Sequence, residues 1–154
     1  MNDWGEKVSF IWSVADLLRG PYRPNQYKDV MLPMTVLRRL DCVLEATKDK
    51  VLAKHAELKT SKIKNVEPIL NRTAGQSFHN TSRFTFKKLK EDHENIAANL
   101  IHYIKSFSSQ TREIIDYFGF EEHIPKLEKS NILYFLISKF GPKIKHHKCI
   151  LLVF

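Results

Sequence analysis

The segment from Phe10 to Asp41 constrains the fold most, because it holds the strongest helical periodicity of the chain. Apolar residues recur at helical spacing before Gly20 and again after it, as Val8, Ile11, Trp12, Ala15 and Leu18, then Val30, Val36, Leu37, Leu40, Val43 and Leu44. Gly20 and Pro21 stop the first series, and Pro24 keeps the connection extended. The pattern predicts two amphipathic helices that meet at a short proline-rich elbow.

The first helix is expected to open at Asp3 and to end by Leu18 or Arg19. Trp12 is placed at the centre of its buried face, so Trp12→Ala is expected to destabilise the domain by roughly 3 to 5 kcal/mol. The second helix is predicted from about Gln26 to about Leu58, with a kink at residues 31–33. The reason is Pro33, which lacks an amide hydrogen and crowds the carbonyl four residues earlier.

The remainder of the chain predicts shorter elements. Residues 59–76 are polar and contain Pro68 and Gly75, which indicates a loop, and residues 77–86 alternate phenylalanines with polar residues, which indicates an extended piece anchored on the core. Base stacking by these phenylalanines is the weaker alternative. Helical periodicity returns from Leu89 to Phe140 in several short segments. The fold class is therefore all-α, an irregular multi-helix bundle with a long kinked second helix and one long polar loop.

Three ordered motifs lie in the organising segment: W-x-x-A-D-x-L-R-G over residues 12–20, Y-K-D-V-x-L-P over residues 27–33 and L-R-R-L-D-x-V-L over residues 37–44. Together they resemble the N-terminal helical domain of the methyltransferase (M) subunit of type I restriction-modification systems. The run 118–140 is similar to the end of that domain. We therefore expect residues 1–140 to form this domain, and residues 141–154 to be a non-homologous tail produced by truncation or a frameshift.

The resemblance implies a role within a larger enzyme. In that family the M subunit pairs with a specificity subunit that reads the target, transfers a methyl group from S-adenosylmethionine to adenine N6, and joins a restriction subunit for cleavage. The helical domain is non-catalytic, helps to close the complex around double-stranded DNA and contacts the other subunits. The expected location is cytoplasmic, with no membrane association.

Catalysis is not expected in this chain itself. Close approach of a backbone to S-adenosylmethionine requires a glycine-rich turn, whereas the nearest two glycines here, Gly5 and Gly20, are fifteen positions apart. The family's DPACGSG-type and NPPF-type motifs are also absent. We expect the chain to bind no S-adenosylmethionine and to be inactive alone. His146, His147 and Cys149 are the nearest approach to a metal-binding set, but a basic tail disfavours cations, and no metal site is expected.

The informative charges are arginines near the elbow. The chain carries a net charge of +8, which favours polyanions without naming one. Arg19, Arg23, Arg38 and Arg39 are candidates for binding DNA phosphates or acidic residues of a partner subunit. Alternatively, Asp16 and Asp41 pair with neighbouring arginines and order a structural elbow that includes Trp12, Gly20 and Pro33. A free-standing basic DNA-binding or protein-interaction module also remains open.

Overall fold

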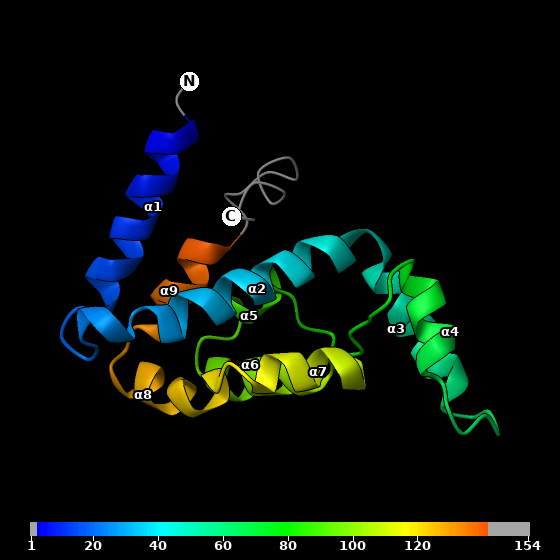
Figure 1. Cartoon of the computed structure of the whole chain (residues 1–154). Coiled ribbons are helices and arrows are strands. Elements are labelled where there is room, and N and C mark those ends of the chain that lie inside the picture. Colours follow the sequence, from blue (N-terminus) through cyan, green and yellow to red (C-terminus); the bar gives the residue numbers. More distant parts are fainter. Residues whose placement is uncertain (1–2, 142–154) are drawn as a thin grey trace.

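The computed structural model describes residues 3–141, and within that range the chain forms helices joined by turns and loops, without a β-strand (Figure 1). The α-helices are α1 (Asp3–Leu18), α2 (Lys28–Leu44), α3 (Lys48–Leu58), α4 (Glu67–Ala74), α5 (Phe86–Leu89), α6 (Ile96–Lys105), α7 (Ser109–Asp116), α8 (Ile124–Lys129) and α9 (Leu133–Phe140). Three 3-10 turns, η1 (Pro24–Gln26), η2 (Glu45–Thr47) and η3 (Phe120–His123), connect some of them. The all-α class is confirmed. The predicted tail, apart from Gly141, lies outside the described residues, with His146, His147 and Cys149.

The elbow between the first two helices is confirmed. α1 ends at Leu18, and the chain turns through Gly20, whose φ of 107° is one that L side chains rarely adopt. Tyr22 anchors the turn, because it is buried and its hydroxyl lies 3.1 Å from His123 Nδ1 in η3. The ammonium group of Lys126 in α8 lies 4.2 Å from the centre of the Tyr22 ring. The elbow is thereby held against η3 and α8, about 100 residues later in the chain.

The long second helix is confirmed as a bent run of 35 residues with a bend of 30°. The α-helix continues through Pro33, which is buried inside α2, and the interruption comes at the 3-10 turn η2 instead. The proline stands near the start of α2, so only about one helical turn precedes it. The interruption at η2 lets α3 leave the line of α2 and pack beside α4, as Figure 1 shows at the right.

The predicted loop over residues 59–76 was wrong in its second half, because residues 67–74 form α4. Pro68 occupies the first turn, where its missing amide hydrogen costs nothing, and Gly75 ends the helix in the left-handed conformation. The two residues that suggested a loop are therefore the start and stop signals of a short helix. The polar loop that remains covers residues 59–66.

The helical series predicted from Leu89 is interrupted between α5 and α6, where residues 90–95 form turns. α7 begins after Ser108, and Gly119 follows it with a positive φ of 62°. Asn131 has a positive φ of 57°, and its backbone amide donates to the carbonyl of Glu128, so it ends α8. Residues 132 and 133 then start α9.

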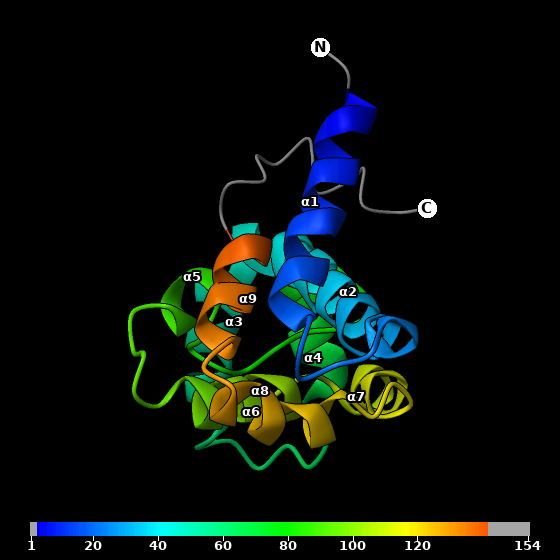
Figure 2. The same ribbon diagram turned by 90° about the vertical axis from the view of Figure 1, so that its left-hand side faces the viewer.

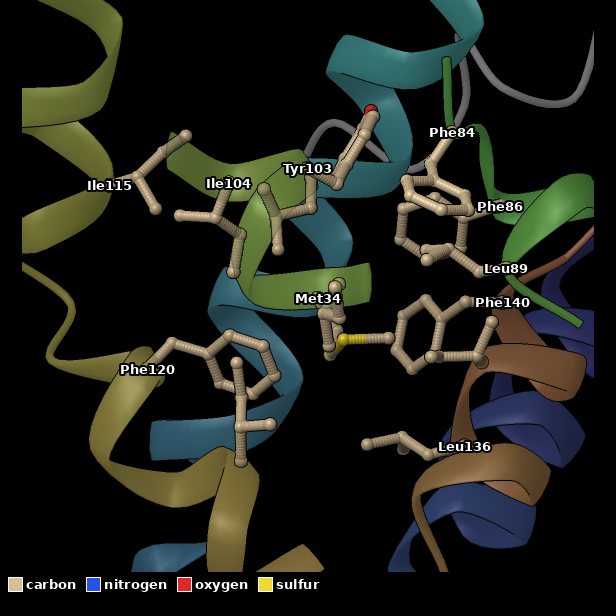
Figure 3. Close-up of a cluster of buried hydrophobic side chains, with 14 of the residues drawn as sticks. Met34, Phe84, Phe86, Leu89, Tyr103, Ile104, Ile115, Phe120, Leu136 and Phe140 are labelled. Carbon is tan, nitrogen blue, oxygen red and sulfur yellow. The ribbon is translucent and has the colours of Figure 1, made fainter. Parts of the chain in front are cut away.

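The core lies between α2 and the helices that follow α4 (Figure 3). Met34 of α2 points toward Phe140 of α9, while Phe120 fills the opposite side of the cluster. Aromatic rings meet edge to face in this core, as Phe86 does with Tyr103 at a centroid distance of 6.2 Å. The buried apolar residues of α1, α2 and the later helices form one continuous cluster, which explains why such short helices are stable here.

The buried face of α1 matches the predicted one only in part: Ala15 and Leu18 are buried, but the rest of the predicted series is exposed. Trp12 is 62% exposed, and Trp4, Val8 and Ile11 are exposed as well. The face that packs on the body contains Val14 and Leu18, while Phe10 meets the ring of Phe140 edge-on at 5.0 Å. α1 carries two adjacent apolar stripes, and helical periodicity does not say which one is buried. Figure 2 shows the N-terminal part of α1 projecting away from the other helices.

This arrangement reverses the expected effect of the Trp12 substitution. Trp12→Ala should change the free energy of unfolding by no more than about 0.5 kcal/mol, as exposed side chains usually do. Leu18→Ala, on the same helix and fully buried, should lower it by roughly 2 to 5 kcal/mol. Urea unfolding of both variants beside the parent measures the difference. A large loss for Trp12→Ala would show that this side of α1 is packed.

Candidate nucleic-acid and partner interface

Arg19 and Arg23 lie at the surface of the elbow. The guanidinium of Arg19 is 3.1 Å from the carboxylate of Asp16, one turn earlier, and both side chains are largely exposed. Arg23 is exposed, and its backbone amide donates to the side chain of Gln26 at 3.0 Å. An exposed pair such as Arg19–Asp16 is screened by water and contributes little stability. Both guanidinium groups are therefore accessible to an anionic partner.

Arg38 and Asp41 form a buried ion pair of the same i, i+3 spacing. The guanidinium lies 2.8 Å from the carboxylate, and each side chain is 8% exposed. Asp41 also accepts hydrogen bonds from the Tyr103 hydroxyl at 3.2 Å and from the Phe86 amide at 3.4 Å. The pair ties α2 to α5 and α6. Asp41 is thus a core residue away from the elbow, and the burial of Arg38 does not suit a phosphate contact.

Two further polar side chains extend this buried group. The Lys48 ammonium donates to Asn80 Oδ1 at 3.0 Å, and the Asn80 amide donates to the carbonyl of Tyr103 at 2.8 Å. Burial lowers the pKa of Lys48 to about 8, against the opposing effect of Asp41. Burial likewise raises the pKa of Asp41, although the Arg38 guanidinium favours the carboxylate. These groups act in structure and are shielded from a macromolecular partner.

The remaining predicted residues are dispersed. Arg39 is half-buried on α2, Pro33 is buried in the same helix, and Gly20 and Asp16 stay at the elbow. The structure thus brings Arg19, Arg23, Asp16 and Gly20 together at one place. It leaves Arg38, Arg39, Asp41 and Pro33 along α2, and it leaves Trp12 on the exposed side of α1.

The phenylalanines of residues 77–86 serve as anchors. Phe84 and Phe86 are buried and Phe78 is half-buried, so their faces are not available to bases. This agrees with the preferred interpretation of that segment. Asn80 also pairs with Phe107 in an isolated antiparallel bridge, which holds the extended piece against the end of α6.

The most prominent surface feature of α1 was not predicted. Trp4, Val8, Ile11 and Trp12 follow one another at helical spacing, and all of them are exposed. Two tryptophans on one exposed helical stripe are typical of a protein–protein contact, since such side chains supply much of the binding energy at interfaces. The helical periodicity of the sequence includes Val8, Ile11 and Trp12, but it predicted them as part of the buried core.

Other kinds of site are not seen in the part of the chain that the structure describes. Residues 3–141 contain no cluster of three or more histidine, cysteine or carboxylate side chains suited to a metal ion. Ser82 Oγ lies 3.0 Å from His102 Nδ1, but it is fully buried and accepts from the Phe84 amide at 3.1 Å, which makes it a structural group. No helix within the same range has the length and apolar character of a membrane span.

Comparison with known families decides the identity of the fold. A family model described as the HsdM N-terminal domain matches residues 7–140. The chain belongs to the HsdM N-terminal domain family. HsdM is the M subunit of type I restriction-modification methyltransferases, so the resemblance found in the three motifs is confirmed. Searches of curated proteins and of solved structures found no match.

The two Arg–Asp pairs of this HsdM N-terminal domain offer a matched test of burial. Arg38→Ala leaves the Asp41 carboxylate buried without its cation, and should lower the free energy of unfolding by about 3 to 5 kcal/mol. Arg19→Ala removes the exposed partner of Asp16 at the same spacing, and should cost less than about 1 kcal/mol. Urea unfolding of the two variants tests this contrast. Similar losses for both would mean that the Arg38–Asp41 pair is not buried in solution.

Proposed function

We propose that this chain is a non-catalytic, cytoplasmic subunit-contact and DNA-clamping domain of a type I modification enzyme. Family membership supports the assignment to the M subunit. The observation that carries the proposal is the exposed apolar face of α1, made of Trp4, Val8, Ile11 and Trp12 on a helix that projects from the body. Exposure of such an apolar face to water is unfavourable, and contiguous exposed apolar residues usually mark a surface that a partner covers.

The occupant that we propose for this face is the specificity subunit. The resemblance to type I M subunits implies pairing with that subunit and joining of a restriction subunit. Side chains of Trp4 and Trp12 are large, rigid anchors that bury a wide area without losing many rotamers. The basic domain then lies beside DNA that the specificity subunit has selected.

DNA contact in this proposal is backbone contact. The net charge of +8 favours binding with counterion release, and the accessible Arg19 and Arg23 offer guanidinium forks to phosphates. We expect the isolated chain to bind any duplex weakly, with a dissociation constant of roughly 0.1 mM to 1 µM that rises steeply with salt. Affinity that does not depend on salt would remove DNA from the proposal.

Methyl transfer is assigned to other parts of the enzyme. The chain has five glycines, spaced too widely for a cofactor-binding turn, and S-adenosylmethionine belongs to the complete subunit in this family. We therefore propose that this chain binds no S-adenosylmethionine. Isothermal titration with the cofactor tests this part, and saturable one-to-one binding would refute it.

Subunit contact through α1 is tested with a double variant, Trp4→Ala with Trp12→Ala. It should keep the parent's thermal stability but lose at least roughly 30-fold in affinity for the specificity subunit of the same system, the equivalent of one strong anchor of about 2 kcal/mol. Tyr117→Ala is the matched control, because Tyr117 is a 93% exposed aromatic residue beyond the end of α7. Analytical ultracentrifugation of each chain mixed with the specificity subunit gives the affinities.

Three outcomes of that experiment decide the occupant. A selective loss for the tryptophan variant supports the specificity subunit. Equal affinities for the tryptophan variant and the Tyr117 control would show that α1 does not contact that subunit. Self-association of the parent chain that the tryptophan variant loses, without any effect on the specificity subunit, would assign the face to a second copy of the chain.

A further inference from the structure

A hollow of about 530 Å³ lies at the surface between three parts of the fold. Its lining comes from α3, from the extended segment before α5, and from α6 with the residues that follow it. These residues are His55, Lys59, Thr81, Arg83, Phe84, Asn99, His102 and Ser106. They are distant in the sequence, and only the packing of α3 and α6 around the extended segment brings them together.

The lining is rich in hydrogen-bond donors and contains no carboxylate among its eight residues. Lys59 and Arg83 supply positive charge, and both are exposed. His55, Asn99 and His102 add ring and amide groups that can donate to an anion. Burial and the neighbouring Lys59 lower the pKa of His55, so at neutral pH it contributes as a neutral donor.

Several of these side chains are held in place. The Arg83 guanidinium lies over the ring of Phe84, 4.9 Å from its centre, and the His102 ring meets the same phenylalanine edge-on at 6.0 Å. His102 Nδ1 is committed to Ser82 Oγ at 3.0 Å, so Nε2 is the ring nitrogen left for a ligand. The ring of buried Phe84 thus packs against both Arg83 and His102 and holds these two donors in place. Preorganised donors of this kind bind an anion with less loss of side-chain entropy.

A carboxylate that contacts the lining of the hollow, that of Asp92, has its own hydrogen-bond partners. Asp92 accepts from the amide of Asn99 at 3.0 Å and from the amide of Asn95 at the same distance. Hydrogen bonds from Asn99 and Asn95, with a smaller effect of Arg83, lower the pKa of Asp92. Asp92 therefore orients Asn99 at the edge of the hollow. Among the described residues, its hydrogen bonds go to Asn95 and Asn99 and not to Lys59 or Arg83.

The segment that contributes Arg83 to the hollow continues into further basic residues. Lys87 and Lys88 of α5 are exposed and follow Arg83 closely in the chain, while Phe84, Phe86 and Leu89 of the same segment point into the core. The segment therefore presents cations outward along its length. A single small anion would not use such an extension, whereas a polyanion with repeated phosphates would.

We propose that this hollow, formed by His55, Lys59, Arg83 and His102, binds a phosphate group of the DNA backbone. The inference rests on the proposed function, since it names a second place where the domain contacts the DNA backbone. It locates the contact on the α3–α6 side, a site separate from the elbow arginines. The contact carries no sequence information, which fits a domain whose target is read by another subunit.

The experiment compares two double variants of the full chain that remove equal charge. Lys59→Gln with Arg83→Gln alters the hollow and keeps much of each side-chain stem. Arg72→Gln with Lys129→Gln is the control, because both residues are exposed on other helices, α4 and α8. Duplex affinity is measured by fluorescence anisotropy at several salt concentrations. The hollow variant should flatten the plot of log affinity against log salt by roughly 0.9 for each DNA phosphate that it no longer neutralises, while the control keeps the parent's slope within about 0.3.

A second measurement uses inorganic phosphate without DNA. Millimolar phosphate should shift the ring proton resonances of His55 and His102 in the parent chain, and not in the hollow variant. A short duplex should shift the same resonances. This probe separates the failure of the hollow from the failure of the proposed function.

Each result has a definite meaning. Selective flattening together with shifts by phosphate and by duplex supports the inference. Shifts by phosphate in a chain that binds no duplex would refute DNA contact as a function, and with it the DNA part of this inference, while the anion site would stand. Equal flattening in both double variants would overturn the inference, because diffuse charge would then explain DNA binding. Absence of any shift would overturn it as well.

Discussion

The buried carboxylate of Asp41 is the interaction on which most of this domain depends. It is bound by Arg38 from its own helix, by the Tyr103 hydroxyl from α6 and by the backbone amide that begins α5. A buried carboxylate is costly unless every acceptor site is used, so the three elements must adopt one relative position. Lys48 and Asn80 extend the same requirement to the start of α3 and to the extended segment. The apolar core holds the helices together, and this polar group selects how they are arranged.

Much of the fold was predictable from the sequence because the motifs of this family encode packing. Leu18, Val30 and Leu37 are fully buried, and Asp41 lies at the polar centre described above. Glycine and proline signals located the elbow correctly. The same signals were misread at α4, where Pro68 and Gly75 delimit a helix of only eight residues. A helix that short offers too few turns for its periodicity to be distinguished from a loop.

The candidate surfaces were harder to predict than the fold, for two physical reasons. α1 has two adjacent apolar stripes, and only the rest of the structure shows that the one with Phe10, Val14 and Leu18 is covered. The basic hollow joins residues from α3, the extended segment and α6, whose proximity depends on long-range packing. The sequence suggested the adjacent Arg38 and Arg39 as a binding pair, but in the fold Arg38 is buried and Arg39 is half-buried on the same helix.

The projection of α1 has a consequence for its dynamics. Its C-terminal part is fixed by Leu18 and the elbow, whereas Trp4 and Val8 lie where the helix has little tertiary support (Figure 2). A helix of 16 residues is only marginally stable in water by itself, so the first turns of α1 should fray and exchange their amide hydrogens much faster than the last turns. Association with another subunit would then complete the folding of α1, and part of the binding free energy would be spent on ordering the helix.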